Sequence, residues 1–395
     1  MTEIRQVRFF IFLKDVFWLA LTTFGGPHAH LAHFQRILVD KRKYIDDHEL
    51  MELNSLCQIL PGPSSTQTLT AIGYRVGGPT LAYLTLLVWI LPSVIIMTAA
   101  GVVLSSIQEK NLSIEFTRFI QPMAVGFVSY AAYTISLKTV YSKTGVVLMI
   151  GAAIASYFFQ TPYVFPIILL VAGAITALKY RNQPKREKDK VKIDWSNFIL
   201  WAGVLIIAAI VGRVTGLLPI RLFENFYRNG SLIFGGGQVL IPMMYTEFVE
   251  FKKYLTSNEF LSGYAFVQSL PGPVFGFSAF IGALSMREYG ILGEILGGFL
   301  CAFAIFLPGT FLIFFVIRFW DALKKYRGVR ASLEGITAAS AGLVASAAII
   351  LFQPLDNTPM NFGFTIGTFC LLAFTKIPSP FIILIGLGLG FIFKV

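Results

Sequence analysis

The sequence predicts an all-α integral membrane protein with two inverted-topology repeats, broken or re-entrant helix hairpins and about nine full crossings of the bilayer. Of its 395 residues, 55% are hydrophobic and only 13% are charged, whereas soluble domains carry about 25% charged residues. A chain with so little polar surface belongs in lipid. Two further observations predict the repeats and their inversion: a long internal sequence repeat, and a reversal of loop charge between its two copies.

Two Gly/Pro motifs occur twice along the chain. A Phe-Gly-Gly motif and a Leu-Pro-Gly-Pro motif each recur 210 positions further on. Their positions are 24–26 with 234–236, and 60–63 with 270–273. Beyond the second motif the separation becomes 216, as between Pro92 and Pro308. A repeat of this length indicates two large fused domains and not a solenoid.

The repeat divides the chain into three regions. We expect an N-terminal repeat over residues 1–180 and an inverted C-terminal repeat over residues 217–395. Residues 181–216 combine a basic cytoplasmic linker with an extra transmembrane helix. That helix, 195–212, has no counterpart in the first half, and one additional crossing turns the second half over in the bilayer.

Uncharged apolar runs mark the crossings, because a helix of about 20 residues spans the hydrocarbon core. The runs are 79–104, 119–137, 145–178, 195–212, 295–317, 335–355, 357–375 and 377–393. Residues 160–162, Gln-Thr-Pro, split the third run into two short helices.

Lysine and arginine orient these crossings, because cytoplasmic loops carry an excess of both. In the first half the turn from Lys138 to Lys143 is basic, and the loop 105–118 is poor in basic residues. In the second half the counterpart of that loop, from Arg318 to Arg330, is basic instead. We therefore expect a multi-pass protein of the cytoplasmic (inner) membrane, with its N-terminus cytoplasmic and its C-terminus outside. The net charge of +11 then reflects cytoplasmic loops and not a nucleic-acid partner.

The Gly/Pro motifs interrupt their helices. Proline lacks a backbone donor and suits the first position of a following helix, and glycine adopts unusual dihedral angles at low cost. Each break therefore presents free N–H groups and the positive end of a helix dipole, which attract anions. We expect residues 8–38 and 50–77 to form re-entrant hairpins whose tips converge near the midplane. Ordinary crossings with kinks or loops are the alternative.

The predicted anion-binding residues lie at or near these breaks. Glycine and proline shape the backbone, polar side chains add donors, and Arg75 attracts a dianion from the cytoplasm. The set is Gly25, Gly26, Pro27, Gln58, Pro61, Gly62, Pro63, Ser64, Ser65, Thr66, Arg75, Gly235, Gly236, Gln268, Pro271, Gly272 and Pro273. Gln67 is a further donor beside it. Residues 274–276 are Val-Phe-Gly where the first half has Ser-Ser-Thr, so we expect the two breaks to contact a substrate unequally.

With both motifs present twice at matched spacing, the whole chain resembles the chromate ion transporter family, in its two-domain, long-chain type. The resemblance implies a secondary transporter that moves chromate, or a similar tetrahedral oxyanion such as sulfate, across the cytoplasmic membrane. It further implies export, chromate resistance and alternating access driven by an ion gradient. The expected partners are the lipid bilayer and a small oxyanion. Self-association into a homo-oligomer is left open.

Other functions are weighed against this one. The alternative is a proton-coupled or metal cation transporter that uses His28, His30 and His33. The sequence holds no H-E-x-x-H, G-x-S-x-G or G-x-x-x-x-G-K-[ST] motif. We therefore expect neither an enzyme nor a nucleotide-binding site for ATP-driven transport in this sequence. Three scattered cysteines predict no disulfide framework, no thiolate metal site and no cofactor.

Overall fold

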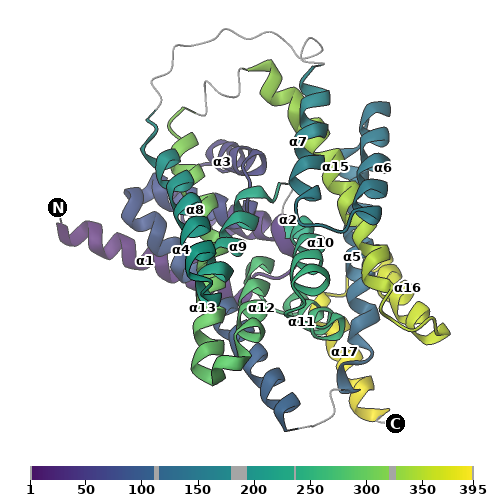
Figure 1. Ribbon diagram of the computed structural model, residues 1–395. Helices are drawn as coiled ribbons and strands as arrows, with labels where there is room; N and C mark the ends of the chain where they lie inside the picture. The colour runs from purple at the N-terminus through teal and green to yellow at the C-terminus, as the bar shows by residue number, and fades with distance from the viewer. Residues whose placement is uncertain (1, 111–114, 179–193, 235–236, 320–325, 394–395) are drawn as a thin grey trace. The chain divides into compact units, whose positions relative to one another are not determined.

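The computed structural model describes residues 2–110, 115–178, 194–234, 237–319 and 326–393, and every regular element among them is a helix. These helices form two compact units (Figure 1). The first unit contains the chain up to residue 105 with residues 195–231 and 267–317; the second contains residues 106–194, 232–266 and 318–395. Each unit therefore draws segments from both sequence repeats.

The predicted all-α membrane class is confirmed within these described ranges. Four helical stretches are long and apolar enough to cross a bilayer: Ser64–Glu109, Ser196–Thr215, Arg287–Val316 and Ala331–Phe352. Five shorter apolar stretches accompany them: Lys143–Phe158, Val164–Ala177, Val274–Ser285, Pro359–Phe374 and Ser379–Ile392. The number of full crossings, the inversion of the repeats and the orientation of the termini stay predictions.

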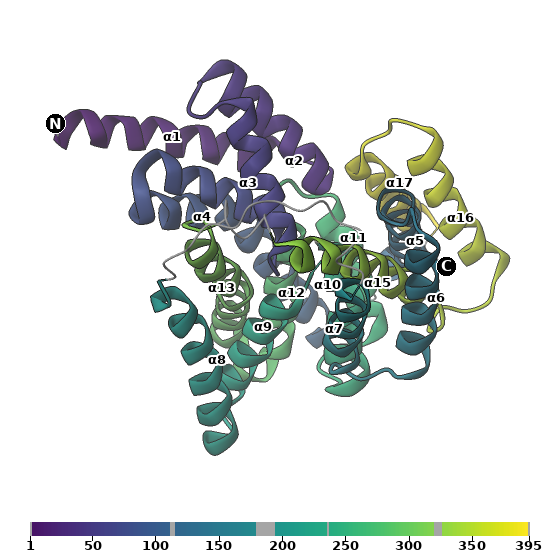
Figure 2. The ribbon, with the colours of Figure 1, turned by 90° about the horizontal axis from the view of Figure 1, so that it is seen from above.

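The first unit begins with helices separated at the predicted breaks. In order they are α1 (Thr2–Thr22), α2 (Gly26–Phe34), the π-helix η1 (Gln35–Lys41), α3 (Asp47–Ile59) and α4 (Ser64–Glu109). The second repeat adds α9 (Leu218–Leu232), the 3-10 turn η5 (Val274–Gly276), α12 (Phe277–Ser285), the 3-10 turn η6 (Arg287–Tyr289) and α13 (Gly290–Val316). The extra helix, α8 (Ser196–Thr215), packs beside α13 (Figure 2).

Helix α4 is bent near its start. Gly78 has φ 78° and ψ −168°, which no residue inside an α-helix adopts, and Pro79 follows it. Glycine tolerates this conformation, and the proline ring prevents the preceding turn from continuing. The arm 64–77 is thus a separate segment from the long helix 79–109, as expected for the returning arm of a broken hairpin.

The second unit is arranged around one long helix. It contains η2 (Glu115–Thr117), α5 (Ile120–Thr139), α6 (Lys143–Phe158), α7 (Val164–Ala177), α10 (Gly237–Tyr245), the π-helix η4 (Thr246–Phe251), α11 (Ser257–Gln268), α15 (Arg327–Phe352), α16 (Pro359–Phe374) and α17 (Ser379–Ile392). Helix α15 packs against α5, α6 and α7. Gly335 and Gly342 permit this, because a Cβ at either would lie 2.0 Å from a carbonyl oxygen of α7 or α6. The helix break predicted at 160–162 separates α6 from α7.

The two repeats share unusual local structures. Both contain a π-helix at the same repeat position, η1 and η4, and each is followed by a lysine with positive φ, Lys43 at 53° and Lys253 at 56°. Positive φ is uncommon outside glycine, so its recurrence indicates one shared local fold. In the first repeat Asp15 anchors this loop by accepting hydrogen bonds from Arg42 and from the Tyr44 hydroxyl, each at 2.8 Å. The carboxylate raises the pKa of the Arg42 guanidinium.

Candidate functional site

Three of the four predicted breaks lie in the first unit. Each contains glycine in the left-handed region: Gly25 has φ 95°, Gly26 has 76°, Gly62 has 114° and Gly272 has 93°. This conformation is accessible to glycine and costly for other residues. At the fourth break, Gly235 and Gly236 lie outside the described residues.

The first Pro-Gly-Pro turn leads directly into α4. Leu60 is extended, Pro61 to Pro63 form the turn, and the helix starts at Ser64. The Gln67 N–H donates to the Pro63 carbonyl at 2.9 Å. The N–H groups of residues 64–66 precede that bond, and groups in this position have no acceptor within their own helix. Ser65, Thr66 and Gln67 are buried, so these amides and the positive helix dipole lie in a place largely closed to solvent.

The Gln67 side chain folds back over the turn. Its Nε2 donates to the Pro61 carbonyl at 2.6 Å, which fixes the orientation of the amide. A Cβ at Gly62 would lie 2.8 Å from this nitrogen, and a Cβ at Gly309 of α13 would lie 2.4 Å from it. Only glycine therefore fits at both places without moving Gln67.

Two aromatic side chains hold the first turn of α4 from outside. His30 of α2 is 1% exposed, and its Nδ1 lies 2.9 Å from the Ser65 hydroxyl. The Trp89 Nε1–H donates to the Thr66 hydroxyl at 3.1 Å. The two rings meet edge to face with centroids 5.3 Å apart. Two predicted donors, Ser65 and Thr66, are thus fixed in place by residues from α2 and from the long part of α4.

The second Pro-Gly-Pro turn packs on the first repeat. The Gly272 N–H donates to the Thr23 carbonyl at 2.9 Å, between α1 and α2. The Ser93 hydroxyl of α4 reaches the Pro273 carbonyl at 3.5 Å, and a Cβ at Gly276 would lie 2.1 Å from that hydroxyl. The Gly272 amide is therefore already used, whereas the N–H groups of Val274 and Phe275 precede the Gly276 N–H bond to the Pro273 carbonyl, as residues 64–66 do at the first turn.

The two turns meet at one stretch of α4. Trp89 contacts the first turn and Ser93 contacts the second, and these residues are one helical turn apart, about 6 Å along the axis. Three residues that contact these turns each carry a buried polar atom with no protein partner among the described residues: Thr23 Oγ1, His30 Nε2 and Gln67 Oε1. Buried polar groups are usually hydrogen-bonded, so this cluster marks a place suited to a polar guest.

The remaining predicted residues lie further out. Gly25, Gly26 and Pro27 start α2, Gln58 is exposed near the end of α3, and Gln268 is half-buried at the end of α11. Arg75 lies 11 residues past Ser64, about 16 Å along the helical arm. Its Nε is 4.0 Å from a Glu49 carboxylate oxygen, and both side chains are partly exposed. The geometry places Arg75 away from the first turn of α4.

Sequence reasoning missed Trp89, Ser93 and Gly309. A signal for two of them was present, because Ser93 and Gly309 each follow a repeated proline, Pro92 or Pro308. Nothing in the sequence marked Trp89. His30 was singled out only within the histidine cluster, and the structure buries it while leaving His33 half-buried. The His28 side chain lies outside the described part.

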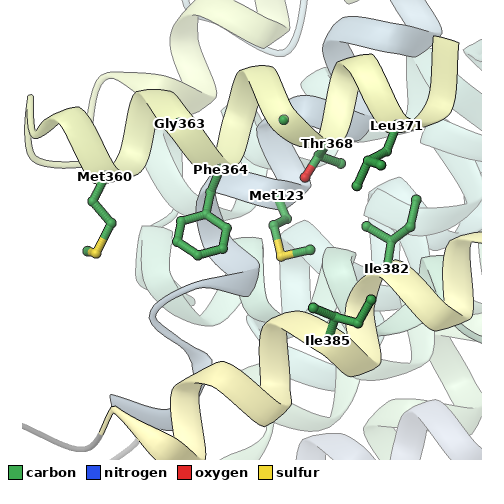
Figure 3. A pocket seen from close by; sticks show the side chains of 9 residues that line it. Met123, Met360, Gly363, Phe364, Thr368, Leu371, Ile382 and Ile385 are labelled. Carbon is green, nitrogen blue, oxygen red and sulfur yellow. The ribbon is translucent and has the colours of Figure 1, made fainter. Parts of the chain in front are cut away.

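The pocket described in the second unit has a different character. It has a volume of about 420 Å³ and lies between α5, α16 and α17 (Figure 3). Met123, Phe364, Ile382 and Ile385 point into it, and Thr368 brings a hydroxyl. An apolar pocket with so few donors does not suit a small anion.

Long apolar helices, interrupted at repeated Gly/Pro turns that gather buried polar groups, are the architecture of a membrane transporter. The chromate transporter family model matches residues 10–178 and 220–391, and this chain belongs to that family. It is accordingly a multi-pass membrane transport protein and not an enzyme.

Relatives match over nearly the whole chain. A probable chromate transport protein of Synechococcus elongatus is 28% identical over 376 residues, which cover 94% of this chain and 92% of the relative. A chromate transport protein of Cupriavidus metallidurans is 25% identical over 376 residues, with 93% and 89% covered. One from Pseudomonas aeruginosa is 26% identical over 343 residues, with 84% and 78% covered. No solved structure is detectably similar to this chain.

Proposed function

We propose that this protein is a secondary transporter that moves chromate across the cytoplasmic membrane and binds it at the first turn of α4. The observation that carries the proposal is the buried cluster around this turn. It combines backbone N–H groups that have no intrahelical acceptor with the hydroxyls of Ser65 and Thr66, while Gln67 holds the turn through the Pro61 carbonyl. A helix N-terminus of this kind favours an anion without an opposite side-chain charge.

Chromate suits this environment in shape and charge. Its four oxygens accept hydrogen bonds in several directions at once, as the amides and hydroxyls of one helical turn require. The relatives that bear the name of chromate transport proteins support chromate as the substrate. Sulfate has nearly the same shape and charge and is the expected competitor. Export is the direction that the resemblance to the chromate ion transporter family implies.

Reciprocal contacts support a two-fold relation between the repeats, and the reversed loop charge supports its being an inversion. The first turn, at Gly62, lies against Gly309, and the second turn, at Gly272, lies against Ser93. Gly309 and Ser93 are repeat equivalents. A two-fold axis produces such exchanged contacts, because each copy then presents the same surface to the other. Inverted repeats related in this way would exchange inward-open and outward-open states by alternating access, with an ion gradient as the driving force.

Chromate flux into proteoliposomes tests the proposal. Purified protein should move chromate, unlabelled sulfate should compete, and Ser65→Ala should lower flux at least tenfold. Ser55→Ala is the matched control, because its exposed hydroxyl on α3 bonds only to its own helix, at the Met51 carbonyl. Equal flux for the wild type and Ser65→Ala would contradict the site, and absence of any chromate flux would contradict the function.

No observation favours the metal cation alternative. Among the described residues, no three histidine, cysteine or acidic side chains lie close enough to hold a metal ion.

A further inference from the structure

The buried His30 side chain lies against the candidate anion site and is not explained by packing alone. It is 1% exposed, its Nδ1 contacts the Ser65 hydroxyl at 2.9 Å, and its Nε2 has no protein partner in the described structure. Ser65 is the second residue of α4, so the imidazole touches the turn where we propose that the anion binds. We propose that His30 is the proton-binding residue that couples anion movement to proton movement. This inference rests on the proposed function.

The hydrogen bond to Ser65 suits a residue that changes its protonation state. A hydroxyl both donates and accepts. Neutral imidazole can therefore accept a hydrogen bond from the Ser65 hydroxyl or donate one to it, and imidazolium donates one from Nδ1. When the imidazole ring takes up a proton, both ring nitrogens carry hydrogen, and the Nε2–H group becomes a second donor. An oxyanion oxygen is the natural acceptor for it.

Charge determines when His30 binds that proton. The side chain is buried, and the first turn of α4 contributes a positive dipole end, so imidazolium is unfavourable while the site lacks an anion. A dianion beside the ring reverses this balance. By linkage, the anion then promotes proton binding, and the proton promotes anion binding by the same factor. Coupling of this sign makes one proton and the dianion move together, as symport with a net charge of −1, which a membrane potential that is negative inside drives outward.

Few other charged groups face His30. On α2 the nearest titratable neighbour is His33, which repels a second positive charge. The facing groups of α4 are the neutral Ser65 and Trp89. The Phe34 ring of α2 also lies beside His30 and carries no charge. The continuation of α2 in η1 carries Arg36, which is exposed. No acidic partner appears among these contacts, so the bound anion is the counter-charge that imidazolium would find.

Calorimetry measures the predicted proton directly. Chromate is titrated into purified protein in two buffers that differ in ionisation enthalpy, at a pH alkaline enough for chromate to be fully dianionic. The wild type should take up a measurable fraction of a proton, up to one, per chromate bound, because linkage makes the bound anion raise the proton affinity of His30. His30→Gln, which keeps an amide beside Ser65 but cannot titrate, should bind chromate more weakly and take up none. His33→Gln, one turn away on the same helix, should still take up a proton on binding chromate, because it keeps His30 and removes only a repulsive neighbour.

The outcomes separate the two proposals. Chromate binding by the wild type without proton uptake overturns the role of His30 and leaves the proposed function standing. Proton uptake that persists in His30→Gln has the same consequence. Absence of chromate binding and flux in the wild type overturns the proposed function and this inference with it. Thermal unfolding shows whether His30→Gln folds. If it does not fold, the protons that the wild type and His33→Gln take up per chromate bound decide whether the role of His30 stands. Flux in proteoliposomes with an internal pH dye should show protons and chromate moving in the same direction.

Discussion

The two Pro-Gly-Pro turns have the same backbone motif and different surroundings. The first leads into a regular α-helix through Ser64, and its neighbours are hydroxyl, amide and imidazole groups. The second leads into a 3-10 turn of Val-Phe-Gly, and its Gly272 N–H is already bonded to the first repeat. Both repeats keep the bend, because the bend depends on glycine and proline. The groups that surround the bend differ between the repeats.

This difference indicates that the two turns have different roles in the protein. A turn followed by buried hydroxyl side chains can bind an anion, whereas a turn followed by apolar side chains and bonded through Gly272 holds its neighbour in place. The Phe275 ring, 6.0 Å from Phe306, extends the packing of the second turn toward α13. The following predictions test whether the two turns differ in this way.

The largest effect is expected from alanine at the turn glycines. Gly62→Ala places a Cβ 2.8 Å from Gln67 Nε2. It also places an alanine at a position whose φ is 114°. The left-handed conformation costs about 1–2 kcal/mol, and overpacking adds about 1–3 kcal/mol. Gly272→Ala has the same backbone strain, but its nearest atoms are 3.5 and 3.6 Å away. We expect Gly62→Ala to lower both thermal stability and chromate flux far more than Gly272→Ala. Similar losses in both would show that the turns are equivalent.

A smaller effect is expected where each turn touches the other repeat. Gly309→Ala places a Cβ 2.4 Å from Gln67 Nε2, so the amide must leave the Pro61 carbonyl. We expect a cost of about 1–3 kcal/mol and several-fold lower chromate flux. Ser93→Ala, at the equivalent position, removes only a 3.5 Å contact and should cost about 0.5 kcal/mol. Thermal unfolding of the two variants measures the difference, and a larger loss for Ser93→Ala would reverse the assignment.

Sequence reasoning predicted the helix breaks because they depend on local chemistry. Pro61, Gly62 and Pro63 end one helix and start the next wherever they occur, and apolar runs become helices in lipid. The pairing of the turns with Gly309 and Ser93 could not be predicted, because it depends on how distant helices pack. The burial of His30 could not be predicted either, because histidine is found both on protein surfaces and in protein interiors. Gln58 and Arg75 were chosen for their chemistry alone, and their exposure follows from the faces of α3 and α4 on which they lie.

The smallest effect is expected at Arg75, which tests whether either repeat attracts the anion with a side-chain charge. The equivalent position of the second repeat is Ser285. The Arg75 guanidinium is 46% exposed and 4.0 Å from Glu49, and exposed pairs of this kind contribute about 0–1 kcal/mol. Arg75→Ala should therefore leave stability nearly unchanged and chromate flux within about twofold, because backbone amides and not a cation hold the anion. Flux measured at low and high ionic strength checks the cause: long-range attraction by Arg75 would weaken as salt screens it. A large, salt-sensitive loss in Arg75→Ala would mean that charge steering matters more in this transporter than the polar first turn.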